Sequence, residues 1–185
     1  MVYILLGAGF EEAEALVTAD ILRRAGLPVS LAGIGGSAVA GSHNIIVQAD
    51  LPVESIALAP GDMVVMPGGM GGVASMEQSP AAMALIAQAQ TDPEMWLAAI
   101  CAAPTLLARA GLLSPGVRAV CYPGMEGELS AAGAVPVMDH SVVTQGRLIT
   151  GRAPGSAFDF GLALVEALAG SDAAGQVRAG LHYAV

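Results

Sequence analysis

Cys101 is the residue of this chain that is best placed to do chemistry. It ends the apolar run WLAAIC (96–101) and precedes Ala-Ala-Pro and a helical pattern, so we expect it at a sharp turn from a strand into a helix. There the helix dipole favours a thiolate, and the N–H of Ala102 points toward an oxyanion formed on a substrate. This position predicts a cysteine nucleophile; the alternative interpretation is an inert, buried thiol, which is common among free cysteines.

Glycines and acids follow two other predicted strands. Gly68 and Gly69 end the run MVVMPGG (63–69) and could bring a second N–H donor close to a substrate, or could form an ordinary turn. Glu11, Glu12 and Glu14 begin a helix at the same end of the sheet, and the helix dipole alone explains such acids. A carboxyl in a dry pocket beside sulfur would have a raised pKa and could exchange a proton with it, and we favour Glu14 for that role.

Composition excludes several kinds of protein. The net charge is −9, from 16 acids against 7 bases, and all seven bases are arginine. Without lysine there is no Schiff base, pyridoxal phosphate site or phosphate-loop lysine. Scattered arginines in an acidic chain also argue against nucleic acid binding.

We expect no cofactor and no metal. The run GAGFEE (7–12) begins like a dinucleotide-binding fingerprint, but glutamate stands at the third glycine position, where it would repel a pyrophosphate. His43, His140 and His182 lie far apart in the sequence and form no metal-binding pattern. Each is interpreted as a surface or structural residue.

The chain is expected to be cytoplasmic. It contains no apolar run of the ~18 residues needed to cross a membrane, and its N-terminus lacks the basic segment of a secretory signal. Cys101 and Cys121 do not resemble the disulfide framework of a small secreted protein. Both thiols are therefore predicted to be free.

Alternating strand and helix patterns predict the elements that must position these residues. The pattern indicates a single domain over 1–185 with a flavodoxin-like, three-layer α/β/α sandwich and a mostly parallel sheet, whose carboxyl strand ends gather functional groups. The alternation over 39–50 predicts either a short hairpin or an excursion at the edge of the sheet. The predicted strands cover 2–8, 29–35, 63–69, 96–101, 118–123, 135–139 and 147–151, and the predicted helices cover 11–25, 79–89, 103–111 and 156–170.

Five sequence blocks, in family order and spacing, resemble the ThiJ/PfpI superfamily, whose fold is that of class I glutamine amidotransferases. Within it, the chain is most similar to the branch of the parkinsonism-associated deglycase and glyoxalase III. The resemblance covers nearly the whole chain. The blocks are GFEEAEALVTADILRRAG, VVMPGGMGG, AAICAAPTLLARAG, CYPGME and LITGRAPGSAFDFGLALVEAL.

The resemblance implies a homodimer with a reactive cysteine at Cys101, a protonated glutamate at Glu14, and oxyanion donors at Gly69 and Ala102. It also implies an anion site near the dimer interface that includes Arg24, whose other interpretation is a surface charge at a helix end. The sequence departs from this pattern at His43, which replaces a second arginine of the anion site.

Tyr122 stands where several members of the superfamily carry a histidine. Its ordinary pKa of about 10 makes it unsuitable as a base at neutral pH, although it could orient a substrate. This departure weakens the amidase or peptidase hypothesis. The leading hypothesis is a cofactor-independent enzyme that acts on small aldehydes or dicarbonyls, and the alternative is a redox-responsive stress protein in which Cys101 is oxidised without turnover.

Overall fold

The computed structural model describes residues 1–183, and its centre is a seven-stranded sheet. The strand order is β10-β11-β7-β6-β1-β2-β5, and every neighbouring pair is parallel except β10 and β11. This arrangement confirms the predicted flavodoxin-like sheet. The strands are β1 (Val2–Leu6), β2 (Val29–Gly33), β5 (Leu51–Pro52), β6 (Met63–Met66), β7 (Trp96–Ile100), β10 (Val142–Gln145) and β11 (Leu148–Gly151).

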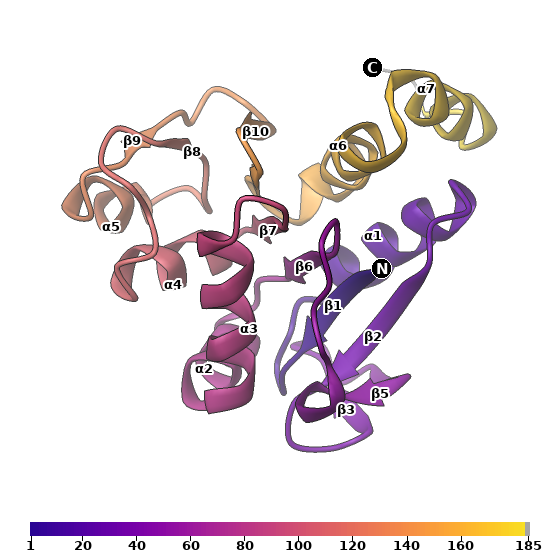
Figure 1. Cartoon of the computed structure of the whole chain (residues 1–185), viewed down its shortest axis with the longest axis horizontal. Coiled ribbons are helices and arrows are strands. Elements are labelled where there is room, and N and C mark those ends of the chain that lie inside the picture. Colours follow the sequence, from indigo (N-terminus) through magenta and orange to yellow (C-terminus); the bar gives the residue numbers. More distant parts are fainter. Residues whose placement is uncertain (184–185) are drawn as a thin grey trace.

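Helices cover both faces of this sheet, as Figure 1 shows. One layer contains α1 (Glu12–Arg24), α6 (Ala157–Ala169) and α7 (Ser171–Gly180), and α6 contacts both of the others. The opposite layer contains α2 (Met70–Gln78), α3 (Pro80–Thr91) and α4 (Ala103–Arg109), with α5 (Glu126–Ala131) packed beside α4. The result is the three-layer sandwich expected from the alternating pattern.

The central strands are apolar because both of their faces are covered by helices. All four residues of β6 and of β11 are buried, which is typical of parallel sheets enclosed in this way. Burying each large aliphatic side chain contributes about 1.5–3 kcal/mol. This packing fixes where each strand ends, and the carboxyl ends of β1, β6 and β7 carry Gly7–Glu14, Pro67–Gly69 and Cys101.

A hairpin and a second small sheet lie outside the main sheet. β3 (Ala38–Ala40) and β4 (Ile46–Gln48) pair in antiparallel fashion, which confirms the predicted hairpin. β8 (Arg118–Ala119) and β9 (Val135–Pro136) pair with each other in parallel. Two short 3-10 helices, η1 (Val53–Ser55) and η2 (Pro154–Ser156), complete the described elements.

Several elements differ from the sequence-based prediction. The strands expected over 118–123 and 135–139 are reduced to β8 and β9, and the first strand ends at Leu6 instead of residue 8. The helices α2, α5 and α7 and the strand β10 were not predicted. Glycines at 71, 72, 127 and 175 lower the helix propensity of the three helices, so packing stabilises them where local sequence does not.

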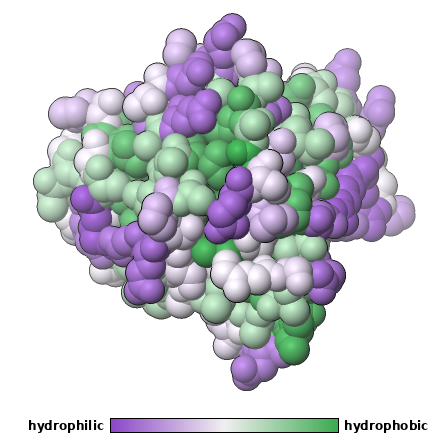
Figure 2. Space-filling model, turned by 60° about the horizontal axis from the view of Figure 1, so that its bottom comes forward, coloured by the Kyte–Doolittle hydropathy of each residue, from purple (hydrophilic) through white to green (hydrophobic). Residues whose placement is uncertain are grey.

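Among residues 1–183, no helix combines the length and the apolar character needed to cross a membrane. Apolar side chains nevertheless reach the surface, and Figure 2 shows them in green between hydrophilic projections on one face. The large exposed ones include Met70, Tyr122, Ile45 and Ile46. Two of these, Met70 and Tyr122, belong to the pocket described below.

Candidate active site

Cys101 occupies the turn between β7 and α4. Its φ of +66° lies in the left-handed region, which a residue with a side chain rarely adopts. Two backbone hydrogen bonds hold it there: the Cys101 N–H donates to the Gly151 carbonyl at 3.0 Å, and the Tyr122 N–H donates to the Cys101 carbonyl at 2.8 Å. Cys101 therefore lies at the predicted sharp turn from a strand into a helix. At this turn it lines a pocket.

Glu14 brings a carboxyl to this thiol from the first turn of α1. Its side chain is fully buried, and its Oε2 accepts a 2.6 Å hydrogen bond from the Gly68 N–H. The carboxyl contacts the Cys101 thiol closely enough to shift the pKa values of both groups. Its other oxygen, Oε1, has no well-aligned hydrogen-bond partner among the described residues.

The glycine turn after β6 makes this contact sterically possible. A Cβ atom at Gly68 would lie 2.6 Å from Cys101 Cβ and 2.7 Å from Glu14 Oε2, which is too close for any side chain. Gly69 has a φ of +81°, and a Cβ there would collide with the Gly9 carbonyl oxygen. Both positions therefore require glycine, because neighbouring atoms lie where a side chain would begin. The alternative interpretation, an ordinary turn, does not explain these contacts.

Backbone donors also face the sulfur. The peptide groups of Gly69 and Ala102 hydrogen-bond toward Cys101 and act to lower its pKa, and both residues line the same pocket. Donors that face a nucleophile from two sides can stabilise charge on a bound oxygen as well as on sulfur. The geometry thus brings together the two residues predicted as oxyanion donors.

The Cys101 thiol is more buried than expected from its position at the elbow, where the helix dipole was predicted to favour a thiolate. Cys101 is only 8% exposed, and burial, followed by the charge and hydrogen bond of Glu14, raises its pKa to about 12. Burial also raises the pKa of Glu14 to about 7. Burial therefore disfavours a negative charge on both groups, instead of favouring a free thiolate.

The thiol opens into a pocket of about 560 Å³. Segments distant in sequence form its walls: the residue before α1, the start of α2, the elbow, the segment after β8, and η2. Sequence reasoning missed several of these residues, although Pro154 follows the carboxyl end of β11 and could have been found from that position. The lining residues are Glu11, Gly69, Met70, Cys101, Ala102, Tyr122, Pro123, Gly124, Met125 and Pro154.

Of the two remaining predicted site residues, Tyr122 lies at the Cys101 pocket and Arg24 does not. Tyr122 lines the pocket and is 46% exposed. Arg24 does not reach it, because it lies at the opposite end of α1 from Glu14. Its Nε donates a 2.7 Å hydrogen bond to Asp20, and its neighbours outside α1 belong to α7. Within one chain, Arg24 is a paired surface charge.

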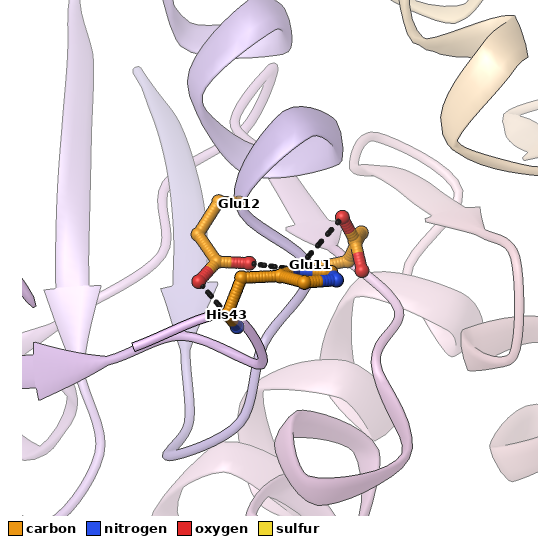
Figure 3. A group of neighbouring side chains, drawn as sticks. All are labelled: Glu11, Glu12 and His43. Atoms are coloured by element: carbon orange, nitrogen blue, oxygen red, sulfur yellow. Dashed lines mark hydrogen bonds and ion pairs between the residues drawn. The ribbon is translucent and has the colours of Figure 1, made fainter. Parts of the chain in front are cut away.

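His43 lies beside Glu11 and Glu12, as Figure 3 shows, because the hairpin between β3 and β4 folds over the start of α1. His43 Nδ1 is 3.0 Å from Glu12 Oε2 and 3.8 Å from Glu11 Oε1. Ligand atoms of the three side chains lie within 4.8 Å of one another, which is close enough to hold one metal ion. This grouping could not be predicted from the sequence, in which the histidines appear isolated.

Ion pairing explains the cluster without a metal. Burial acts to raise the pKa of Glu12, but hydrogen bonds from His43, from the backbone and from Ser42 outweigh it and lower the pKa to about 2. The bond to Glu12, with the charges of both glutamates, raises the pKa of His43. The imidazole and the backbone N–H of His43 both hydrogen-bond the Glu12 carboxylate, at 3.0 Å and 2.7 Å, and these bonds anchor the hairpin to α1.

The fold and the site define a class of protein: a flavodoxin-like sandwich with a strained cysteine elbow faced by a buried glutamate. Comparison with known proteins identifies the family. Residues 1–167 match the DJ-1/PfpI family, and the chain belongs to it.

Relatives with a similar sequence match almost end to end. The chain is 40% identical over 179 residues to Protein dj-1beta of Drosophila melanogaster, covering 96% of this chain and 94% of that protein. It is 31% identical over 162 residues to the Caenorhabditis elegans protein named glutathione-independent glyoxalase DJR-1.2, covering 88% and 84%. The crystal structure of Drosophila melanogaster DJ-1beta superposes with a TM-score of 0.92 at 38% identity, covering 100% of this chain and 98% of that chain.

Proposed function

We propose that this protein is a cofactor-independent glyoxalase that converts small dicarbonyls into 2-hydroxy acids, with Cys101 as nucleophile and Glu14 as acid and base. The observation that carries the proposal is the buried Glu14 carboxyl. It lies beside the Cys101 thiol, which lines a pocket, and its pKa is raised to about 7. A group that titrates near the working pH can both accept and return a proton.

The reaction begins with a proton transfer, because the thiol is not ionised in advance. The Glu14 carboxylate takes the thiol proton as sulfur adds to the aldehyde carbon, and the proton returns to the new alkoxide to give a hemithioacetal. The N–H groups of Gly69 and Ala102 stabilise the negative oxygen while it forms.

The next steps are an internal redox change followed by hydrolysis. Glu14 removes the hydrogen of the former aldehyde carbon as a proton and delivers a proton to the neighbouring carbon, while the hydroxyl proton of the hemithioacetal passes to the former ketone oxygen, so that the first carbon is oxidised and the second reduced. The product of this step is a 2-hydroxy thioester. Water then cleaves the carbon–sulfur bond, releasing the 2-hydroxy acid and restoring the thiol. Water is the only co-reactant, and the reaction needs no metal ion or nucleotide.

A relative supports this choice of substrate. The similar Caenorhabditis elegans protein carries the name glutathione-independent glyoxalase. The present chain differs from amide hydrolases with a cysteine–histidine pair, because among the described residues no histidine lines the Cys101 pocket. Protonation of an amine leaving group would have to come from a group other than histidine, so the amidase or peptidase hypothesis has less support.

The direct test is conversion of methylglyoxal to lactate by purified protein. We expect activity in the unchanged chain, its loss in Cys101→Ser, and its retention in Cys121→Ala, since Cys121 is the other free cysteine and lies outside the pocket. Absence of lactate from the unchanged protein, or equal rates in it and in Cys101→Ser, would overturn the proposal.

A second candidate function is redox sensing by the same thiol. The observation favouring it is that the chain resembles a solved structure titled "Toxoplasma gondii DJ-1, oxidized", with a TM-score of 0.90 and 31% identity, covering 100% of this chain and 98% of that chain. Two equivalents of peroxide would convert the thiol to a sulfinic acid and release two waters. A stable gain of two oxygens on Cys101 after mild peroxide, without methylglyoxal consumption, would favour sensing.

We also propose that the protein works as a homodimer in the cytoplasm. The two free thiols are compatible with a reducing compartment. Arg24 is remote from the pocket of its own chain. In a dimer it could contribute to a site shared between the two copies. Light scattering measures the mass, and an 18.4 kDa species would contradict the dimer.

A further inference from the structure

The walls of the Cys101 pocket differ in character from its chemical base. Cys101, Gly69 and Ala102 line one part of it, with the fully buried Glu14 carboxyl behind the sulfur, whereas Met70, Tyr122, Met125 and Pro154 line the rest. Met70 is 68% exposed and Tyr122 is 46% exposed. Large apolar side chains that converge from different segments of the chain are typical of a binding surface.

The volume of the pocket exceeds what a three-carbon dicarbonyl requires. Cavities of about 300–1,000 Å³ bind drug-sized ligands, and this one measures about 560 Å³. Methylglyoxal bound to sulfur would leave the outer, apolar part filled with water. A substituent that displaces this water would gain binding energy from contact with the methionines and the tyrosine ring.

Charge at the rim limits which substituent fits. The Glu11 carboxyl also lines the pocket, and Ser42 holds it through a 3.0 Å hydrogen bond to Oε2. No arginine is among the lining residues, and His43, the imidazole beside Glu11, does not line the pocket either, so an anionic substituent inside it would face the Glu11 carboxylate. The walls therefore favour a neutral, apolar group.

We infer that the preferred substrates of this site are neutral 2-oxoaldehydes with an aromatic or bulky apolar substituent, and that Met70 and Tyr122 determine this preference. The inference rests on the proposed function and specifies its substrate class. Aromatic faces suit this pocket because the Tyr122 ring can stack on them and methionine sulfur makes favourable contacts with ring edges.

The test compares three substrates by quantifying the 2-hydroxy acid formed: methylglyoxal, phenylglyoxal and 4-carboxyphenylglyoxal. We expect kcat/KM for phenylglyoxal to exceed that for methylglyoxal at least about tenfold, the range that apolar pockets provide for added carbon groups. We expect 4-carboxyphenylglyoxal to lose most of this advantage. Cys101→Ser serves as the blank for reaction of phenylglyoxal with arginines.

Two wall variants and one matched control assign the preference to residues. Met70→Ala and Tyr122→Ala should each reduce the phenylglyoxal-to-methylglyoxal ratio several-fold. Ile46→Ala removes a side chain that is 69% exposed, like Met70, but lies outside the pocket, so its ratio should not change.

The possible results separate the two proposals. Turnover of methylglyoxal with no preference for phenylglyoxal, or a preference that survives both wall variants, overturns the specificity inference and leaves the glyoxalase function standing. No acid from any of the three substrates overturns the glyoxalase function and this inference with it.

Discussion

The Gly68 N–H donates a 2.6 Å hydrogen bond to Oε2 of the buried Glu14 carboxyl. This bond connects the turn after β6 to the first turn of α1 and fixes the carboxyl against the Cys101 thiol. Burial opposes ionisation of both side chains more strongly than any other influence on them, so the proposed function requires a neighbouring base to activate the sulfur.

Glu14→Gln should reduce dicarbonyl turnover by about 10²–10⁴-fold, because the amide preserves the shape of the carboxyl but cannot move a proton. In the unchanged protein, alkylation of Cys101 by iodoacetamide should rise with pH through about 7, as Glu14 ionises. The variant should lack this rise, because its amide accepts no proton, and should react only as its thiol ionises directly, at a pKa that the missing Glu14 charge no longer raises. Thiolate absorbance at pH 6 in the unchanged protein would contradict this account.

The stability of the protein should fall as pH rises from 4.5 to about 7, through Glu14. The folded pKa lies above the ordinary value of 4.5, so the folded state binds more protons than the unfolded state in this interval. The shift corresponds to a loss of about 3 kcal/mol. Urea unfolding at several pH values should show this slope in the unchanged protein, and a parallel slope in Glu14→Gln would exclude Glu14 as its origin.

Glu12 should have the opposite effect on stability, although it lies on the same helix turn. Its pKa is lowered to about 2, so the unfolded state binds more protons between pH 2 and 4.5. The stabilisation is complete above pH 4.5 and is lost as pH falls toward 2. Glu12→Gln should be less stable than the unchanged protein at pH 7 and should lose less stability on acidification. Glu166→Gln, which removes an exposed carboxyl, is the control.

Gly68→Ala should damage both activity and folding. The new methyl group would meet Cys101 and Glu14 at less than van der Waals separation, and overpacking of this kind costs about 1–3 kcal/mol. Gly127→Ala is a matched control, because nothing lies within 4 Å of its Cβ position and its site is helical; it should be neutral or stabilising. Thermal unfolding and methylglyoxal turnover measure both effects, and full activity of Gly68→Ala would contradict the steric argument.

The local sequence was sufficient to predict a helix or strand wherever its hydrophobic periodicity and its capping residues agree with the packing in the folded protein. The apolar runs after Gly61 and before Cys101 could only be buried strands, and a cysteine between such a run and Ala-Ala-Pro could only stand at a turn. The first helix was predicted almost to its ends because acids precede its apolar face and Arg23 and Arg24 follow it. These features depend on neighbours in the chain.

The helix α2 shows why other elements could not be predicted. Gly71 and Gly72 disfavour a helix, yet a Cβ at Gly72 would lie 2.7 Å from Phe10 Cα. Close packing against the loop after β1 therefore requires glycine and provides the stabilisation that propensity lacks. The sequence contains no local signal of that contact.

By itself, the sequence determined the sheet, the elbow at Cys101 and the set of acids near it, because periodicity and strand ends are local properties. Only the tertiary structure decided which acid meets the thiol, that burial raises the pKa of both groups, that His43 pairs with Glu12, and that Arg24 lies at the other end of α1. The physical reason is that desolvation and ion pairing depend on which atoms surround a group in space, and those atoms come from segments far apart in the chain.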